Sequence, residues 1–197
     1  LAAFRNIPSQ HTLVRAGGWQ TELGRSVQGS TIGVLGLGRF GRIFADFVRP
    51  LGAKLIAWSP NLTPGRAAEA GVAYVQKEEF FRTADAISIH MVLGETTRHL
   101  VGAAELALMK PDAVLVNTSR GPIVDEAAMI VALVADRLGC AALDVFDVEP
   151  LPAGHPLRSL PNALATPHLG YCTEVIMRNY HERTVREIRA WAAQRHG

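Results

Sequence analysis

The sequence predicts a doubly wound α/β fold, in which helices cover both faces of a parallel β-sheet. Short apolar runs alternate with helical patterns along most of the 197 residues, which is typical of strand–helix–strand units with right-handed crossovers. The apolar runs are continuous rather than alternating, as expected of strands that are buried on both faces. In such a sheet, binding and catalytic groups lie outside the carboxyl ends of the strands.

The expected elements follow one another in the order that this fold requires. Strands are expected at residues 31–35, 54–58, 73–75, 86–90, 113–117, 140–144 and 163–166. Helices are expected between them, near residues 41–48, 63–70, 77–82, 103–109 and 125–136. The first ten residues, LAAFRNIPSQ, are interpreted as the middle of a helix, and residues 174–195 as a long amphipathic helix.

The composition limits the classes of function. Hydrophobic residues make up 48% and charged residues 19%, which allows a sizeable core. The net charge of +2 comes from bases scattered among acids, so no nucleic-acid or membrane-surface partner is expected. No apolar run reaches the roughly 18 residues of a spanning helix. Cys140 and Cys172 make neither a disulfide framework nor a metal site, so we expect a cytoplasmic protein without a metal.

The segment VLGLGRFG, residues 34–41, predicts a dinucleotide site. Gly36, Gly38 and Gly41 form G-x-G-x-x-G after an expected strand and at the start of an expected helix. Gly36 would allow the tight turn, Gly38 the close approach of a pyrophosphate, and Gly41 the close packing of helix on strand. The amides and the dipole of the helix start would attract the phosphates. The alternative is a merely structural turn.

Four later strands end in polar side chains. Each of these could be an ordinary loop residue, but their shared place at the carboxyl ends of one sheet favours a site. A histidine near a carboxylate can exchange protons near neutral pH, and an arginine fork matches a substrate carboxylate. With a nicotinamide cofactor, these groups could reduce a 2-keto acid. The polar residues are His90, Thr96, Thr97, Asn117, Thr118, Ser119, Arg120, Asp144, Glu149, Thr166 and His168.

Four ordered segments, VLGLGRFG, MKPDAVLVNTSRGPIVDE, AALDVFDVEPLPAGHPL and ATPHLGY, resemble the D-isomer-specific 2-hydroxyacid dehydrogenases. The resemblance runs from about Arg15 to the end of the sequence. It implies a Rossmann-type dinucleotide-binding domain over residues 1–197, with residues 1–15 as the incoming crossover segment and residues 173–197 as the outgoing helix. The sequence starts at Leu1 and stops after a helix, so both ends are expected to be cut and the family's substrate domain to be absent.

The resemblance also implies an activity. The implied activity is that of an NAD(P)-dependent oxidoreductase, which reduces a 2-keto acid to a D-2-hydroxy acid and catalyses the reverse reaction, as in a glyoxylate or hydroxypyruvate reductase. This chain alone is expected to be inactive. Relatives dimerise through the nucleotide domain, and residues 90–110 resemble the segment that makes much of that contact, so a homodimer is expected.

Roles for individual residues follow from the resemblance. Arg120 would bind the substrate's carboxylate and carbonyl, His168 would be the acid/base, and Glu149 would hydrogen-bond His168. Asp144 would face the nicotinamide carboxamide, whereas His90 is expected to be structural. The residues expected to bind the cofactor are Gly36, Gly38, Arg39, Phe40, Gly41, Ser59, Asn61, Met91, Thr97, Thr118, Ser119, Asp144 and Gly170.

Ser59 departs from the family, because members that use NAD usually carry aspartate at this position. A carboxylate there accepts hydrogen bonds from the ribose and repels a 2′-phosphate. Ser59 lacks that charge, so use of NADP or of both cofactors is favoured over NAD alone. Arg39 and Arg66 are candidate cations for the phosphate. The alternative is a neutral substitution in an enzyme that uses NAD.

Three other interpretations stay open. A dinucleotide-sensing binding protein of the corepressor type can keep Arg120, Glu149 and His168, and turnover of any 2-keto acid would separate it from a reductase. A formate dehydrogenase would pair the histidine with glutamine, so Glu149 argues against it. A purely structural domain would not need these three residues at strand ends.

Overall fold

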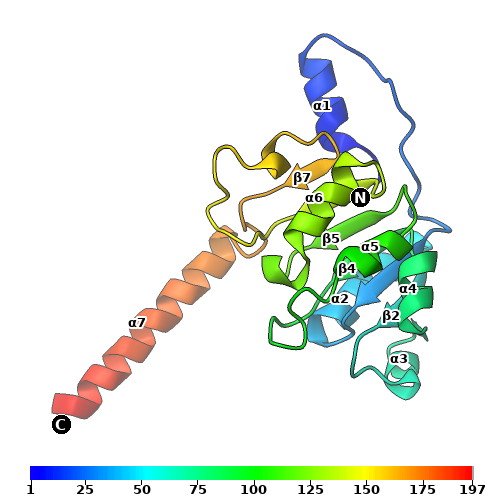
Figure 1. Ribbon diagram of the computed structural model, residues 1–197. Helices are drawn as coiled ribbons and strands as arrows, with labels where there is room; N and C mark the ends of the chain where they lie inside the picture. Colours follow the sequence, from blue (N-terminus) through cyan, green and yellow to red (C-terminus); the bar gives the residue numbers. More distant parts are fainter. Residues whose placement is uncertain (197) are drawn as a thin grey trace. The chain divides into compact units, whose positions relative to one another are not determined.

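The computed structural model describes residues 1–196 (Figure 1). They divide into two units, Leu1–Pro167 and a second unit that begins at His168. The first unit holds a seven-stranded sheet in the order β3-β2-β1-β4-β5-β6-β7, and every neighbouring pair is parallel. The chain therefore winds from β1 to one edge and then from β4 to the other. This confirms the predicted doubly wound sheet. The strands are β1 Thr31–Leu35, β2 Lys54–Trp58, β3 Ala73–Tyr74, β4 Ala86–Ile89, β5 Val114–Asn117, β6 Cys140–Leu143 and β7 Ala163–Ala165.

Helices cover both faces of the sheet. One face packs against α4, α5 and α6, which lie side by side in Figure 1. The other face packs against α2, α3 and the N-terminal segment around Phe4. The helices of the first unit are α1 Ile7–Arg15, α2 Arg39–Val48, α3 Pro64–Glu69, α4 Lys77–Thr83, α5 Ala103–Leu108 and α6 Glu126–Val134, with 3₁₀ turns η1 Arg49–Leu51, η2 Gly121–Ile123 and η3 Pro156–Arg158.

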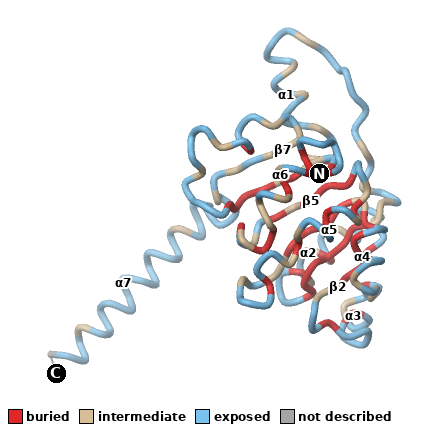
Figure 2. The backbone as a smooth tube through the Cα atoms, viewed as in Figure 1, coloured by how far each residue is buried: buried red, intermediate tan, exposed pale blue. Residues whose placement is uncertain are grey.

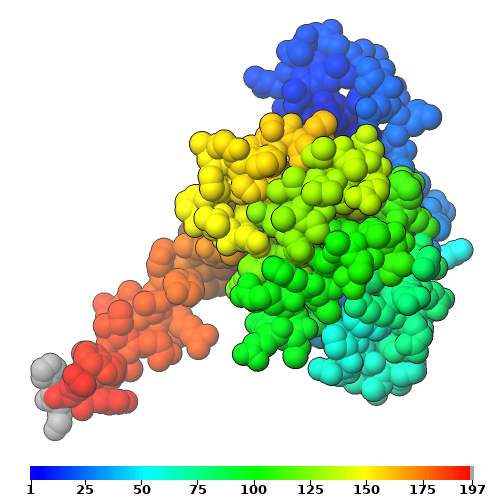
Figure 3. Space-filling view, viewed as in Figure 1, coloured from blue at the N-terminus to red at the C-terminus, as the bar shows by residue number. Residues whose placement is uncertain are grey.

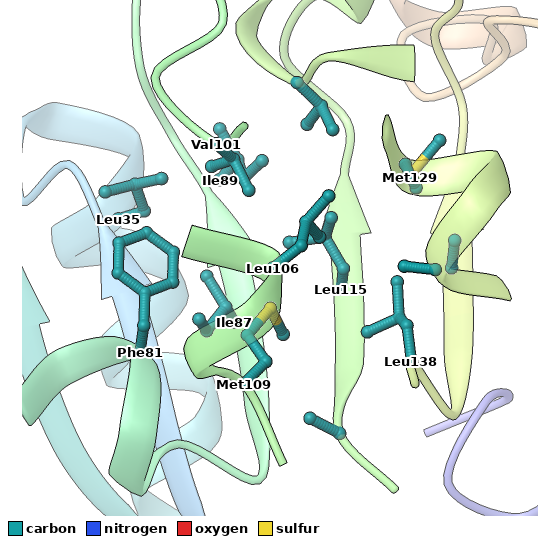
Figure 4. Close-up of a cluster of buried hydrophobic side chains, with 14 of the residues drawn as sticks. Leu35, Phe81, Ile87, Ile89, Val101, Leu106, Met109, Leu115, Met129 and Leu138 are labelled. Carbon is teal, nitrogen blue, oxygen red and sulfur yellow. The ribbon is translucent and has the colours of Figure 1, made fainter. Parts of the chain in front are cut away.

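The core divides between the two faces because successive strand residues point to opposite sides. In β1, Ile32 and Val34 face α2 and α3, whereas Leu35 faces α4. Figure 4 shows Leu35 and Ile87 beside Phe81 of α4, on the face of the sheet that α4, α5 and α6 cover. Figure 2 shows the same result along the chain, since the buried residues concentrate in the strands. Each fully buried side chain of this kind contributes roughly 1.5–3 kcal/mol.

The first helix differs from the sequence-based expectation. It begins at Ile7 rather than running through the first ten residues, and residues 2–6 form turns. Asn6 has a left-handed backbone with φ 50°, and Pro8 stands at the start of the helix. Proline lacks an N–H and has a fixed φ, so it suits the first turn of a helix and not the middle.

Several strands also end one residue earlier than expected. His90, Asp144 and Thr166 directly follow β4, β6 and β7 instead of ending them. These polar residues leave the sheet and begin the loops at its carboxyl edge.

The second unit consists of a turn and the long helix α7, Glu174–His196. Thr173 accepts a hydrogen bond from the Ile176 N–H at 3.3 Å and so caps the helix start. Figure 2 shows α7 exposed over most of its length. In the part of the chain that the structure describes, no helix is both long and apolar enough to cross a membrane.

Candidate functional site

The carboxyl ends of the strands form one level edge. In the register of the sheet, Leu35 pairs with both Trp58 and Ile89, and Asn117 pairs with Ile89 and Leu143. Each of these residues is the last of its strand. The loops that follow therefore start side by side. The strand order reverses between β1 and β4, which is where such sheets bind their ligands.

The glycine turn follows β1, and each of its glycines meets a different condition. Gly36 has φ +95°, and a Cβ there would lie 2.7 Å from the His90 carbonyl oxygen. A Cβ on Gly41 would lie 2.1 Å from the Gly36 carbonyl oxygen. A Cβ on Gly38 would meet nothing within 4 Å. Two glycines are thus needed by the fold itself, whereas Gly38 faces open space.

The start of α2 adds hydrogen-bond donors beside that space. The helix begins at Arg39, and its first amides have no partner within the helix. Arg39 and Phe40 are exposed. A bare glycine backbone next to such amides fits a pyrophosphate. The residues of the turn therefore fit a dinucleotide cofactor.

The loop after β2 carries Ser59 and a nearby cation. The Ser59 carbonyl accepts the Leu62 N–H at 3.1 Å, which closes the loop. The Arg66 guanidinium donates to the Asn61 carbonyl at 3.4 Å, and the Arg66 N–H donates to Thr63 Oγ1 at the same distance. Arg66 therefore lies along the loop that begins with Ser59.

His90, after β4, is held as a neutral side chain. Its ring lies 4.8 Å from that of Phe44, and Nε2 lies 2.9 Å from Ser88 Oγ. Burial lowers the pKa of His90 to about 4. These contacts agree with the structural role expected of His90, which stays a prediction.

The loop that follows β4 holds Met91 and Thr97. Met91 is half-buried, and its Sδ would lie 2.6 Å from a Cβ on Gly36. Thr97 is buried, donates through Oγ1 to the Val92 carbonyl at 2.7 Å and accepts the Gly94 N–H at 2.8 Å. The Thr97 hydroxyl therefore fixes the shape of its own loop.

Asn117 builds the turn that presents Arg120. It is 1% exposed, its Nδ2 donates to the Arg120 carbonyl at 2.9 Å, and its Oδ1 accepts the Ser119 N–H at 3.0 Å. Ser119 Oγ donates to the Ile89 carbonyl at 2.7 Å and ties the turn to β4. Thr118 and Arg120 are exposed. Asn117 was expected among the polar residues at strand ends, but the sequence assigned it no role of its own.

Asp144 and Glu149 lie in the loop after β6. Asp144 is buried, its N–H donates to the Asn117 carbonyl at 3.0 Å, and its Oδ1 accepts from Thr166 Oγ1 at 2.5 Å. Glu149 Oε1 accepts the Phe146 N–H at 2.9 Å. Both carboxylates are therefore held at the carboxyl edge of the sheet.

Gly121 brings the Arg120 turn and the Glu149 loop together. A Cβ on Gly121 would lie 2.1 Å from the carbonyl carbon of Phe146 and 2.6 Å from the Asp147 nitrogen. Only glycine allows two backbones to approach so closely. The sequence-based reasoning missed Gly121, because a glycine after an arginine is in itself an ordinary loop residue.

His168 and Gly170 belong to the second unit. His168 has a left-handed backbone with φ 52°, and its ring lies edge-on to that of Tyr171 at 5.7 Å. The structure thus gathers the expected residues of the first unit at one edge. The approach of His168 to Arg120 and Glu149 stays a prediction.

Similarity to known proteins covers the same residues. Residues 1–170 match the family described as D-isomer specific 2-hydroxyacid dehydrogenase, NAD binding domain. The glyoxylate reductase of Aeropyrum pernix is 39% identical over 182 residues, which cover 88% of this chain and 54% of that protein. The D-3-phosphoglycerate dehydrogenase of Methanocaldococcus jannaschii is 38% identical over 177 residues, which cover 88% of this chain and 34% of that protein.

Solved structures of related enzymes also resemble the chain, both in sequence and in fold. The phosphoglycerate oxidoreductase of Vibrio cholerae has a TM-score of 0.88 and 37% identity, over 96% of this chain and 63% of that one. The D-lactate dehydrogenase of Lactobacillus jensenii, solved with NAD⁺, has a TM-score of 0.82 and 29% identity, over 98% of this chain and 62% of that one. The chain spans about half the length of the glyoxylate reductase and about a third of the length of the phosphoglycerate dehydrogenase.

Proposed function

Because the chain belongs to the D-isomer-specific 2-hydroxyacid dehydrogenases, whose NAD-binding domain it matches, we propose that it forms the cofactor-binding part of an enzyme that reduces a 2-keto acid to a D-2-hydroxy acid, and the reverse. The observation that supports this most directly is the contact of Gly121 with the Phe146–Asp147 peptide. This contact joins the Arg120 turn to the Glu149 loop at the carboxyl edge of the sheet, where the glycine turn also lies.

Each proposed catalytic residue has a distinct task. Arg120 binds the substrate's carboxylate and carbonyl through its paired N–H donors. His168 gives a proton to the carbonyl oxygen during reduction and takes it back during oxidation, with Glu149 as its carboxylate partner. The nicotinamide cofactor supplies the hydride when bound. Gly36, Gly38, Arg39, Phe40 and Gly41 would hold its pyrophosphate.

Turnover of 2-keto acids by the full-length protein tests this proposal. His168→Asn should lower kcat on the order of 10²–10⁴-fold, because it removes the general acid. The Kd of the dinucleotide should stay the same. A full-length protein that binds dinucleotide and turns over no 2-keto acid would instead favour a dinucleotide-sensing binding protein of the corepressor type.

The proposed substrate class is glyoxylate or hydroxypyruvate. The glyoxylate reductase relative supports it, and the phosphoglycerate dehydrogenase relative makes a phosphorylated keto acid the alternative. A panel of glyoxylate, hydroxypyruvate, phosphohydroxypyruvate and larger keto acids separates the two. A kcat/KM that is highest for phosphohydroxypyruvate contradicts this part of the proposal.

We propose NADP, or both cofactors, rather than NAD alone. Ser59 lacks the charge of an aspartate, and Arg66 lies along the same loop through its bond to the Asn61 carbonyl. Ser59→Asp in the full-length protein should shift the preference toward NAD by roughly 1–3 kcal/mol, the scale of one charged hydrogen-bonding group. A wild-type preference for NAD above about 100-fold, or roughly 2.7 kcal/mol, contradicts the proposal.

We further propose a homodimer formed through residues 90–110, in a cytoplasmic protein. In this segment the Val92 side chain is 86% exposed, so it is available to a partner subunit. The two cysteines are free thiols in the structure. Light scattering tests the dimer, and Val92→Asp should weaken it. A monomer at tens of micromolar contradicts the proposed dimer.

A further inference from the structure

Glu126, the first residue of α6, binds the loop after β6 at two places. Its Oε2 accepts the Asp147 N–H at 3.3 Å, and its Oε1 lies 3.0 Å from His155 Nε2. The Glu126 and His155 side chains are only 16% and 19% exposed. Polar contacts on open surface contribute little, but this hydrogen bond to a carboxylate is partly shielded, and the same carboxylate also bonds the main chain.

The other nitrogen of His155 is also in use. The Leu157 N–H donates to Nδ1 at 3.4 Å, at the start of η3. Nδ1 therefore presents its lone pair, and Nε2 carries the hydrogen that points to Glu126. Leu157 itself is buried, so the histidine is fixed to the core on one side and to α6 on the other.

Glu149 lies in the loop between these two attachment points. Its carboxylate accepts the Phe146 N–H, one residue before Asp147. The Phe146–Asp147 peptide also rests on Gly121. In Figure 3 the yellow surface of residues 150–160 lies directly against the yellow-green surface of α6.

We propose that Glu126 and His155 form a clamp that positions Glu149 relative to Arg120. The clamp joins the start of α6 to both ends of the segment 147–155, so a shift of this whole segment away from α6 breaks a bond to Glu126. The two clamp residues are positioning residues, since they act through Glu149. This inference rests on the proposed function of Glu149.

The charges around Asp147 agree with this packing. Burial and the Glu126 carboxylate raise the pKa of Asp147, and Asp125 acts in the same direction, while His99 and Arg98 act against it. The Asp147 carboxyl thus lies close enough to Glu126 to be affected by its charge, as the bond from the Asp147 N–H also requires.

The test uses the full-length enzyme with Glu126→Gln, His155→Phe and the double variant. Each single change should lower kcat about 10- to 100-fold, the scale of a catalytic group displaced by about 1 Å, and leave the Kd of the dinucleotide unchanged. The double variant should be no worse than the poorer single one, because both changes open the same clamp. Asp125→Asn is the matched control, since it removes a neighbouring charge but keeps the acceptor that caps α6 through the Ala128 N–H.

Amide hydrogen exchange measured by mass spectrometry on residues 145–149 tests the clamp without reference to turnover. Exchange should be faster in Glu126→Gln and His155→Phe than in wild type and Asp125→Asn. Equal exchange in all four proteins overturns the clamp, as does faster exchange with unchanged kcat. A wild type that turns over no 2-keto acid contradicts the proposed function, while the exchange result still decides whether the clamp exists. If Glu126→Gln fails to fold, His155→Phe gives the same comparison from the loop side.

Discussion

At the scale of single residues, Asn117 holds the turn that presents Arg120. Asn117→Ala should leave the Ser119 N–H and the Arg120 carbonyl without the partners they have now. We expect the free energy of unfolding to fall by about 1–3 kcal/mol, the cost of buried polar groups that lose their hydrogen bonds. Urea unfolding of the chain measures this. Asn179→Ala on the exposed surface of α7 is the comparison and should change it by less than about 0.5 kcal/mol.

Asp85 makes the stability of the first unit depend on pH. Burial would raise the pKa of Asp85, but the hydrogen bonds from Lys110 (2.8 Å) and the Thr31 N–H (2.7 Å) outweigh it, with the charges of Lys110 and Arg25. The net effect lowers the pKa of Asp85. A lowered pKa in the folded state means stabilisation that is present above the unfolded value of about 3.9 and is lost as the pH falls.

Asp85→Asn should therefore lower the free energy of unfolding at pH 7 by about 1–3 kcal/mol, as expected for a hydrogen-bonded charge. The difference between the variant and the wild type should shrink as the pH falls below the unfolded value of about 3.9, and it should vanish only below the lowered pKa of Asp85 in the folded state. Asp112→Asn is the matched control, because Asp112 also pairs with Arg25, at 3.3 Å, but is 69% exposed. A difference that does not shrink as the pH falls below the unfolded value of about 3.9 would contradict the assignment.

At the scale of elements, two glycines of the same turn serve different purposes. Gly36 is required by the fold, whereas Gly38 is required only by the proposed ligand. Gly36→Ala forces a side chain onto φ +95° and against the His90 carbonyl, so the free energy of unfolding should fall by about 1–3 kcal/mol. Gly38→Ala meets nothing in the protein and should leave the melting temperature unchanged.

Gly38→Ala should, however, weaken the binding of the dinucleotide. A methyl group on Gly38 stands where the backbone has to approach the pyrophosphate, so calorimetry should find the dinucleotide bound at least about tenfold more weakly, which is 1.4 kcal/mol. Unchanged affinity in a folded Gly38→Ala protein would mean that the turn does not bind phosphate.

At the scale of the whole molecule, cofactor binding and turnover should separate. The chain matches a cofactor-binding domain and covers 54% of its glyoxylate reductase relative. Closure of a second domain over the cofactor normally completes such a site and excludes water. We expect this 197-residue chain to bind dinucleotide in a calorimetric titration and to turn over little or no 2-keto acid. Turnover comparable to that of full-length relatives would contradict this.

The sequence by itself determined the sheet, the glycine turn and the set of polar residues at the strand ends. These features depend on local patterns, namely apolar runs, the spacing of three glycines, and the residue that follows a strand. The prediction was wrong at the first helix, because it took residues 1–10 as the middle of a helix although Pro8 suits the first turn of one. Strand ends were placed one residue late, since an apolar run does not show where pairing stops.

Only the tertiary structure decided how these parts hold one another. Gly121 touches Phe146, Glu126 bonds His155, and the Asn117 carbonyl bonds the Asp144 N–H, yet each pair is separated by more than twenty residues along the chain. No local pattern names the partner of a glycine that meets a distant backbone or of a carboxylate that bonds a distant ring. These contacts arise because parallel strands bring separate loops to one edge, where close approach and hydrogen bonding then select the residues.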